Sequence, residues 1–301
     1  MARIPQLNGQ RVLLLFTVIL PITFEMESTQ EGFTYFKNLD AIKEFFEKDL
    51  NPYSRNILES FKKECLYMED PGLPRGRRRP FIVIDGNHRA CRNVVGMKLS
   101  RKLGGRYLSH PSPCLHDYFK KLSQGMTRRA FYLLSIYAMD LNVKVHINLN
   151  RPVIVNGHWL EQVVFPLLQF LPPNDDFPPA SSEVFDLPTD LLAPDLVVYL
   201  DTEDNNMTKP RTAVNKRRSV KLYEKLASRY PITIQPMLPG PNRHTIEKIY
   251  GIIWNNLSEH LDFRHINRPY QFYKYQNLIT TNKLNQTIHT YRPVISQPTE
   301  I

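Results

Sequence analysis

Hydrophobic and polar positions follow two patterns that alternate along the middle of this 301-residue chain. Continuous apolar runs predict buried strands at residues 81–84, 153–155, 196–200 and 232–237. Around these runs, apolar residues recur every three to four positions, which predicts helices at residues 93–103, 127–143, 160–168, 216–230 and 243–262. Apolar strands that alternate with helices indicate an α/β fold, in which a parallel sheet carries helices on both faces.

Two more amphipathic helices are predicted ahead of this region, at residues 39–50 and 54–67. Their apolar faces consist of Ile42, Phe45, Phe46 and Leu50 in the first helix and of Ile57, Leu58, Phe61 and Cys65 in the second. We expect these helices to form an N-terminal helical appendage. Residues 71–80 are rich in proline, glycine and arginine, and they predict a solvated linker.

The first 24 residues contain Arg3 and Arg11, no acidic residue, and an apolar run shorter than the ~20 residues that span a membrane. We expect a targeting leader at residues 1–24 that directs the chain to mitochondria. The alternative is the secretory pathway, in which the glycosylation sequons at Asn206, Asn256 and Asn285 would matter. The chain then divides into this leader, the appendage and linker at residues 25–79, a main domain at residues 80–262, and a polar, basic tail at residues 263–301.

The formal net charge of +10 suits an anionic ligand, a membrane surface or nucleic acid, and it also suits a mitochondrial matrix protein. Aromatic residues among the tail's cations would suit stacking on single-stranded nucleic acid. No RNA-binding signature accompanies them, so a mobile or loosely docked extension is favoured over a nucleic acid partner. The three cysteines, Cys65, Cys91 and Cys114, are widely spaced and indicate neither a disulfide framework nor a metal site.

The first predicted strand runs into a sequence that resembles a phosphate-binding loop. That loop needs a glycine, four residues, and then Gly-Lys-Ser/Thr, whereas Gly86 is followed at the last three places by Cys91, Arg92 and Asn93. A cysteine crowds the approach of phosphate to the backbone, an arginine fork needs a different pocket from a lysine, and an amide replaces the hydroxyl that holds Mg²⁺. The candidate phosphate-binding residues are Gly86, Asn87, His88, Arg89, Ala90, Cys91, Arg92 and Asn93.

Four further motifs follow in order: GGRYLSHPSPC at residues 104–114, RRAFY at 128–132, PVIVNGHW at 152–159 and LLAPDLVVYLD at 191–201. Together with the loop, they resemble the thymidylate kinase family, and its mitochondrial UMP-CMP kinase branch most closely, over residues 80–262. The resemblance implies the parallel-sheet fold of P-loop nucleoside monophosphate kinases and a homodimer. In an active member it also implies phosphorylation of dTMP, dUMP, CMP or UMP with ATP and Mg²⁺.

The chain departs from the family pattern at a second place. Family members carry an aspartate and an arginine directly after the third core strand, where this sequence has Asn156 and Gly157. Phosphoryl transfer depends on positioning and electrostatic stabilisation, so the loss of these charges together with the loop lysine removes most of the catalytic apparatus. No residue is assigned a catalytic role; Arg92, Asn156 and Gly157 mark the degenerate positions.

Two other groups could contribute to binding. Basic residues after the last motif could form a reduced lid over a phosphate, or they could be a solvated loop: Lys209, Arg211, Lys216, Arg217 and Arg218. Phe131, with Tyr132 and Tyr137, could flank a base or belong to the core.

These observations favour a catalytically degenerate pseudokinase that acts as a nucleotide-binding or partner-binding module. Its expected partner is a nucleotide or phosphate anion, or a protein that the sequence does not identify. The alternative is an active nucleoside monophosphate kinase that uses ATP and Mg²⁺ with an atypical loop.

Overall fold

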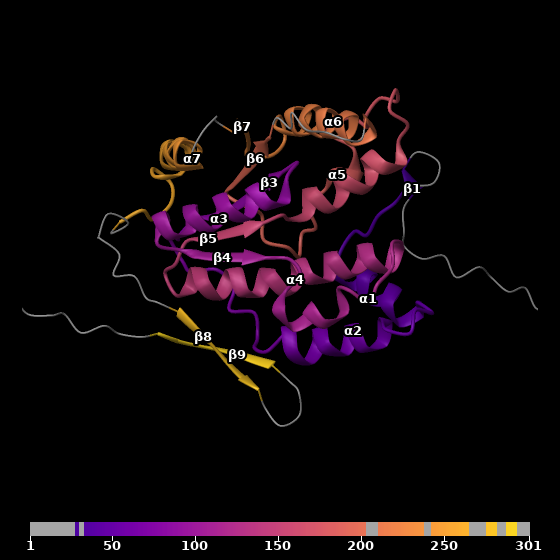
Figure 1. Cartoon of the computed structure of the whole chain (residues 1–301), viewed down its shortest axis with the longest axis horizontal. Coiled ribbons are helices and arrows are strands. Elements are labelled where there is room, and N and C mark those ends of the chain that lie inside the picture. Colours follow the sequence, from indigo (N-terminus) through magenta and orange to yellow (C-terminus); the bar gives the residue numbers. More distant parts are fainter. Residues whose placement is uncertain are drawn as a thin grey trace, which may run out of the picture.

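The computed structural model describes residues 28–29, 33–202, 210–237, 242–264, 275–281 and 287–293. Five parallel strands form its central sheet in the order β4-β5-β3-β6-β7 (Figure 1). Their bounds are β3, Phe81–Gly86; β4, Arg106–Ser109; β5, Val153–Asn156; β6, Leu196–Asp201; and β7, Ile232–Pro236. This sheet and its helices confirm the predicted α/β fold, in which a parallel sheet carries helices on both faces.

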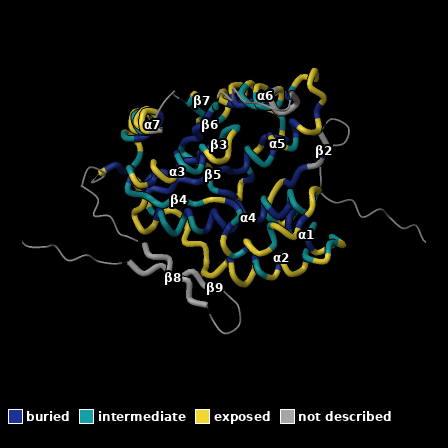
Figure 2. Tube along the Cα trace, viewed as in Figure 1, coloured by how far each residue is buried: buried dark blue, intermediate teal, exposed yellow. Residues whose placement is uncertain are grey.

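Alternate residues of the strands pack against helices on opposite faces of the sheet. Ile82 and Ile84 of β3 face α3 (Arg89–Leu103) and α7 (Asn242–Leu257). Phe81 and Val83 face the core under α4 (Met126–Asn148), α5 (Trp159–Phe170) and α6 (Pro210–Leu226). Figure 2 shows this distribution, with buried residues concentrated along the sheet and exposed residues on the outer sides of the helices. Both faces of the sheet are therefore covered, which explains why its strands are apolar throughout.

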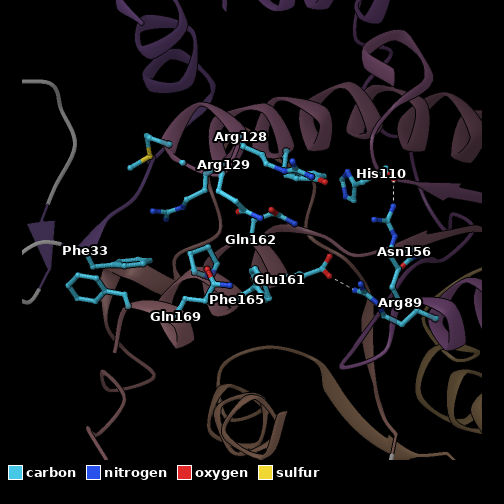
Figure 3. A pocket seen from close by; sticks show the side chains of 17 residues that line it. Phe33, Arg89, His110, Arg128, Arg129, Asn156, Glu161, Gln162, Phe165 and Gln169 are labelled. Atoms are coloured by element: carbon cyan, nitrogen blue, oxygen red, sulfur yellow. Dashed lines mark hydrogen bonds and ion pairs between the residues drawn. The ribbon is translucent and has the colours of Figure 1, made fainter. Parts of the chain in front are cut away.

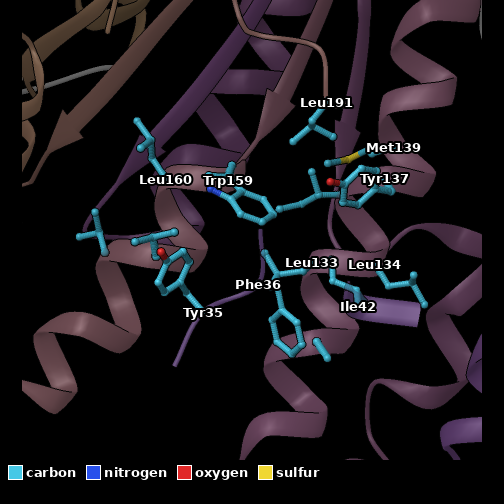
Figure 4. Packing of buried hydrophobic residues seen from close by; sticks show 14 of the residues in the cluster. Tyr35, Phe36, Ile42, Leu133, Leu134, Tyr137, Met139, Trp159, Leu160 and Leu191 are labelled. Atoms are coloured by element: carbon cyan, nitrogen blue, oxygen red, sulfur yellow. The ribbon is translucent and has the colours of Figure 1, made fainter. Parts of the chain in front are cut away.

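The two N-terminal helices belong to the main core and not to a separate appendage. They are α1 (Leu39–Lys48) and α2 (Ser54–Ser60), and α2 continues as one π-helical segment, η1 (Phe61–Cys65). Phe36 and Ile42 pack in the cluster that also contains Leu133 and Leu134 of α4 and Trp159 of α5 (Figure 4). Removal of this segment would therefore expose the apolar face of α4.

A disulfide bond joins Cys65, at the end of η1, to Cys114, in the 3₁₀ segment η2 (Pro113–Tyr118). The expectation of no disulfide was wrong. Because the partners are 49 residues apart and follow no local spacing motif, only the packing of α2 against the segment after β4 brings them together. The bond fastens the N-terminal helices to the sheet domain. Cys91 is free and half-buried.

The arginine run at residues 77–79 is also more ordered than a solvated linker. Arg78 makes a bidentate ion pair with Asp195, with distances of 2.7 and 2.8 Å. Arg79 is buried and donates to the side-chain oxygen of Asn150 and to the carbonyl of Asp262. Arg77 donates to three carbonyl groups just after α7: those of Ser258, Glu259 and Leu261. The prediction of a solvated linker was therefore wrong for these residues.

Two small antiparallel pairs complete the described structure. One pairs β1 (Ser28–Thr29) with β2 (Phe33–Thr34), and the other pairs β8 (Tyr275–Thr281) with β9 (Thr287–Pro293). A short 3₁₀ segment, η3, spans Glu183–Phe185. Within the described part of the chain, no helix is both long and apolar enough to cross a membrane. The predicted leader at residues 1–24, the rest of the tail, and the sequons at Asn206 and Asn285 lie outside the described residues.

Candidate functional site

The turn after β3 is held closely against β6. Gly86 has a φ of +143°, and a Cβ atom there would lie 2.4 Å from the carbonyl oxygen of Leu200. Only glycine fits such a close backbone approach. The next residue, Asn87, donates through its amide to Asp201 at 3.0 Å and accepts from the backbone N–H of Thr202 at 3.0 Å. Gly86 and Asn87 therefore fix the turn to the neighbouring strand.

Helix α3 begins at Arg89, so only Asn87 and His88 separate it from β3. His88 caps the helix, since its Nδ1 accepts from the N–H of Cys91 at 3.3 Å. The N–H of Asn87 donates to Leu200, and that of Arg92 donates to His88. A phosphate-binding loop needs successive free N–H groups. The turn after β3 is therefore not such a loop, because Ala90, Cys91, Arg92 and Asn93 lie in the opening turns of the helix.

Arg92 points inward and forms an ion pair with Glu161, with 2.5 Å between Nη1 and Oε1. Its side chain is 8% exposed. Burial alone would lower the pKa of Arg92, but the carboxylates of Glu161 and Asp85 raise it. This guanidinium, at the place of the family's lysine, is therefore held by an internal carboxylate.

Asp85 lies in the same buried cluster and accepts from the hydroxyl of Tyr223 at 2.7 Å. Burial, with a further contribution from the charge of Glu161, raises the pKa of Asp85 to about 7. Within the described part of the chain, the Nε of Arg92 and the Oδ1 of Asp85 are both buried without a hydrogen-bond partner. The carboxyl groups of Asp85 and Glu161 and the guanidinium of Arg92 thus form one interacting cluster.

Gly157 makes room for the carboxylate of Glu161. Its φ is +77°, and a Cβ atom there would lie 2.0 Å from Oε2 of Glu161 and 3.6 Å from Nη1 of Arg92. Its carbonyl oxygen accepts from Nε2 of His110 at 3.0 Å. Burial lowers the pKa of His110 to about 4, so this ring is neutral near pH 7. Where the family places an arginine, this chain has an ion pair supplied by two other residues.

Asn156 and Asn93 bond to each other through their side chains. The amide of Asn156 donates to Oδ1 of Asn93, and the hydroxyl of Tyr107 donates to the same oxygen at 2.9 Å. The one oxygen that could replace the lost metal-binding hydroxyl is therefore already engaged twice. Among the described residues, no group of three or more His, Cys, Asp or Glu side chains is arranged to hold a metal ion.

A cavity of about 670 Å³ lies beside this cluster, between α4 and α5 (Figure 3). Arg128 and Arg129 extend into it from the first turn of α4, while Glu161, Gln162 and Gln169 come from α5. The guanidinium of Arg128 also lies 5.8 Å from the ring of Tyr132, and that of Arg129 lies 5.0 Å from the ring of Phe33. The lining thus combines cations, aromatic rings and amides: Arg89, Arg92, Arg128, Arg129, Phe33, Tyr132, Phe165, Phe170, Gln124, Gln162, Gln169 and Asn156.

A second cavity of about 710 Å³ lies between α5 and α6, next to the turn at Gly86. Tyr199, Lys216 and Tyr223 contribute to its wall. It shares five lining residues with the first cavity: Arg89, Arg92, Glu161, Phe165 and Gln169. The ion pair of Arg92 and Glu161 therefore stands at the boundary between the two cavities.

The other candidates from the sequence lie in different places. Phe131 is fully buried in the core and lines neither cavity, whereas its neighbour Tyr132 lines the first. Arg217 is exposed and lines neither cavity. Arg218 is buried and donates to the carbonyl of Leu171 at 3.1 Å, which is a structural contact. The side chain of Arg211 lies outside the described residues, so its predicted lid role stays a prediction.

Sequence reasoning missed Glu161, Arg128 and Arg129 as site residues. The RRAFY motif contributed only to the family resemblance, although its two arginines face the first cavity. Glu161 lies in the first turn of α5, four residues after Gly157, and no motif marks it. The missing side chain at position 157 was the one available signal, because it leaves space that a nearby side chain can fill.

Comparison with protein-family models gave no match, and comparison with curated proteins gave none either. Solved structures match part of this chain at low identity. Thymidylate kinase from Candida albicans is 13% identical with a TM-score of 0.46, covering 60% of this chain and 93% of its own. Deoxyadenosine kinase from M. mycoides, solved with dATP, is 15% identical with a TM-score of 0.41, covering 57% and 98%. Thymidylate kinase from Ehrlichia chaffeensis is 11% identical with a TM-score of 0.41, covering 59% and 98%.

Proposed function

We propose that this chain binds a nucleoside monophosphate in the first cavity without phosphorylating it. The observation that carries the proposal is the ion pair between Arg92 and Glu161. An active enzyme of this fold needs a mobile cation on the phosphate that is transferred. Here the cation at that position is buried against a carboxylate, and the N–H of Cys91, at the start of α3, donates to the side chain of His88.

The lining of the first cavity supports this ligand class. Arginine forks match the geometry of phosphate oxygens, and Arg89, Arg128 and Arg129 all line the cavity. Aromatic rings such as Tyr132 and Phe165 suit the face of a base, and the three glutamines offer both donors and acceptors to its edge. A volume of about 670 Å³ falls in the range of small-molecule sites.

The proposal is tested by two assays on the purified full chain. The full chain is needed because α1 and α2 share the core with α4. Calorimetric titration with dTMP, dUMP, CMP and UMP should show saturable binding that is unchanged by EDTA. Incubation with ATP, Mg²⁺ and each monophosphate should yield no diphosphate, whereas turnover at ordinary kinase rates of about 1–100 s⁻¹ would overturn the proposal.

A matched pair of variants locates the site. Arg128→Ala together with Arg129→Ala removes two cavity cations and should abolish binding. Arg217→Ala removes an exposed arginine outside both cavities and should leave the affinity unchanged. Equal losses in both variants would indicate nonspecific attraction to the basic protein and would contradict the proposed site.

The second candidate is an active nucleoside monophosphate kinase that requires ATP and Mg²⁺. One observation favours it: Arg89 and Lys216 line the second cavity beside Gly86, where a donor phosphate would approach. The turnover assay decides between the two candidates.

The disulfide supports a proposal on location. Cys65 and Cys114 form a bond that persists in oxidising compartments, which favours the secretory alternative over the mitochondrial matrix. Asn256, in an Asn-Leu-Ser sequon, is exposed near the end of α7. In a chain expressed through the secretory pathway, Cys65 and Cys114 should react with a thiol reagent only after reduction, and peptide-N-glycosidase should remove a glycan. A mitochondrial matrix protein with reduced cysteines and no glycan would contradict this.

A further inference from the structure

The carboxylate of Glu161 stands where the two cavities meet. Both cavities are lined by Glu161, Arg92 and Arg89, together with Phe165 and Gln169. The side chain of Glu161 is 26% exposed, so it faces the cavity space as well as Arg92. A ligand that extends from the first cavity into the second must therefore pass this carboxylate.

We infer that Glu161 is a specificity-determining residue that limits the bound nucleotide to a single phosphate group. The inference rests on the proposed function and adds the reason why one phosphate is accepted and a chain of phosphates is not. The first phosphate can bind the cavity arginines, Arg128 and Arg129, which enter from α4 (Figure 3). A second or third phosphate must extend toward the wall that carries Glu161.

Two features of that wall oppose further negative charge. Glu161 presents a carboxylate, and like charges that approach closely within a partly enclosed site repel strongly because solvent screens them less. Two cations line both cavities: Arg92 is paired with Glu161 at 2.5 Å and buried, and Arg89 donates through Nη2 to the carbonyl of His110 at 3.0 Å. Arg92 therefore cannot turn toward a phosphate without leaving a carboxylate unpaired.

The local geometry shows that Glu161 is fixed in this position. It lies in the first turn of α5, and Gly157 one turn earlier leaves the space that its Oε2 occupies. A side chain at position 157 would displace the carboxylate, because a Cβ atom would lie 2.0 Å from it. Arg92 lines both cavities, and its Nη1 is the atom that pairs with Glu161. Removal of the charge at position 161 should therefore make this guanidinium available to a ligand.

The test measures the affinity of the full chain for CMP, CDP and CTP, and for dTMP, dTDP and dTTP, in EDTA and at constant ionic strength. The wild type should bind the monophosphates and lose about tenfold in affinity with each added phosphate. Glu161→Gln keeps the shape and removes the charge, so it should bind the di- and triphosphates at least as tightly as the monophosphates. Glu161→Asp should keep the wild-type order. Glu224→Gln removes an exposed carboxylate from α6 and controls for the change in net charge.

The outcomes separate this inference from the proposed function. If the wild type binds monophosphates but Glu161→Gln keeps the same order of affinities, Glu161 does not select the ligand and the proposed function stands. If Glu224→Gln changes the order as much as Glu161→Gln, the effect is one of net charge and the inference also fails. If neither the wild type nor Glu161→Gln binds any of the six nucleotides, the proposed function itself fails. Glu161→Ala removes the same charge and replaces the glutamine variant if that variant does not fold.

Discussion

The carboxylate of Glu161 occupies the space that a side chain on Gly157 would need, since a Cβ atom at position 157 would lie 2.0 Å from it. These two residues are one structural unit with Arg92, whose guanidinium pairs with Glu161. The changes at positions 92 and 157 that distinguish this chain from the family it resembles are therefore linked through a third residue. An arginine introduced at position 157 would therefore clash with the carboxylate of Glu161, which already occupies that space.

We predict that a variant carrying the family's residues at five positions will not bind Mg²⁺-ATP. Its substitutions are Cys91→Gly, Arg92→Lys, Asn93→Thr, Asn156→Asp and Gly157→Arg. Position 157 has a φ of +77° and is blocked by Glu161, and only Asn87 and His88 still separate Gly86 from the start of α3. Calorimetry with ATP and Mg²⁺ measures the result. Addition of Glu161→Ser to the five changes removes the obstruction and is the matched comparison; binding by the five-residue variant alone would contradict the account.

Gly86→Ala should destabilise the fold by more than about 2 kcal/mol, because a methyl group would meet the carbonyl of Leu200 at 2.4 Å in addition to backbone strain. Gly125 provides the control. It has the same φ of +143°, but a Cβ atom there would meet nothing within 4 Å. Urea unfolding of both variants separates the two contributions. Equal losses of unfolding free energy would mean that backbone conformation, and not the contact with β6, requires glycine at position 86.

Replacing both Cys65 and Cys114 with serine should lower the unfolding free energy by about 4 kcal/mol, as expected when a crosslink between residues 49 apart is removed. Reduction of the wild type should have a similar effect. Cys91→Ser, at the free and half-buried cysteine, should change stability by less than about 1 kcal/mol. Guanidinium unfolding with and without reductant measures all three. If the unfolding free energy of the wild type is the same with and without reductant, the disulfide does not stabilise the fold and the prediction is wrong.

Asp85 should make stability fall as the pH rises from about 4 to about 7. Its folded pKa of about 7 lies above the ordinary value of 3.8, so the folded state binds more protons than the unfolded state in this window. Asp85→Asn can still accept from Tyr223 but does not titrate. The stability of this variant relative to the wild type should therefore rise across the window, by at most about 1.4 kcal/mol per pH unit.

His110 and His158 are present in both proteins, and burial holds their pKa values near 4 and 3. Their contribution cancels in the comparison between Asp85→Asn and the wild type. Thermal or urea unfolding at pH 4, 5, 6, 7 and 8 provides the data. Parallel stability curves for the two proteins would show that Asp85 is ionised in the fold throughout this range.

Much of the fold could be predicted because its strands are apolar on both faces. The observed bounds of β3, β5, β6 and β7 lie within two residues of the predicted ones. A short, continuous apolar run such as Phe81 to Ile84 is typical of a strand that is buried on both faces. β4 was missed because none of its four residues is fully buried and it begins with Arg106. Contacts between distant residues carried no local signal. The pair of Arg78 and Asp195 is 117 residues apart, and the disulfide joins two cysteines that follow no motif.

The candidate site could be predicted in location but not in detail. The carboxyl ends of β3 and β5 do meet, as parallel strands require, and they bring Arg92 near Gly157. The direction of the Arg92 side chain depends on Glu161, which no pattern distinguishes from an ordinary acidic residue in the first turn of a helix. The first cavity depends on Arg128 and Arg129, whose place relative to α5 is a result of helix packing.

The arginines at residues 77–79 resemble a cleavage site for proteases that recognise paired basic residues, but the fold hides it. Such a protease must draw several residues in extended form into its cleft, with the arginine side chains inside its pockets. Arg78 is held by Asp195, and Arg79 is buried against Asp262. Cleavage after these arginines requires the segment to detach from β6 and from the end of α7, so a cut there marks chains that have already begun to unfold.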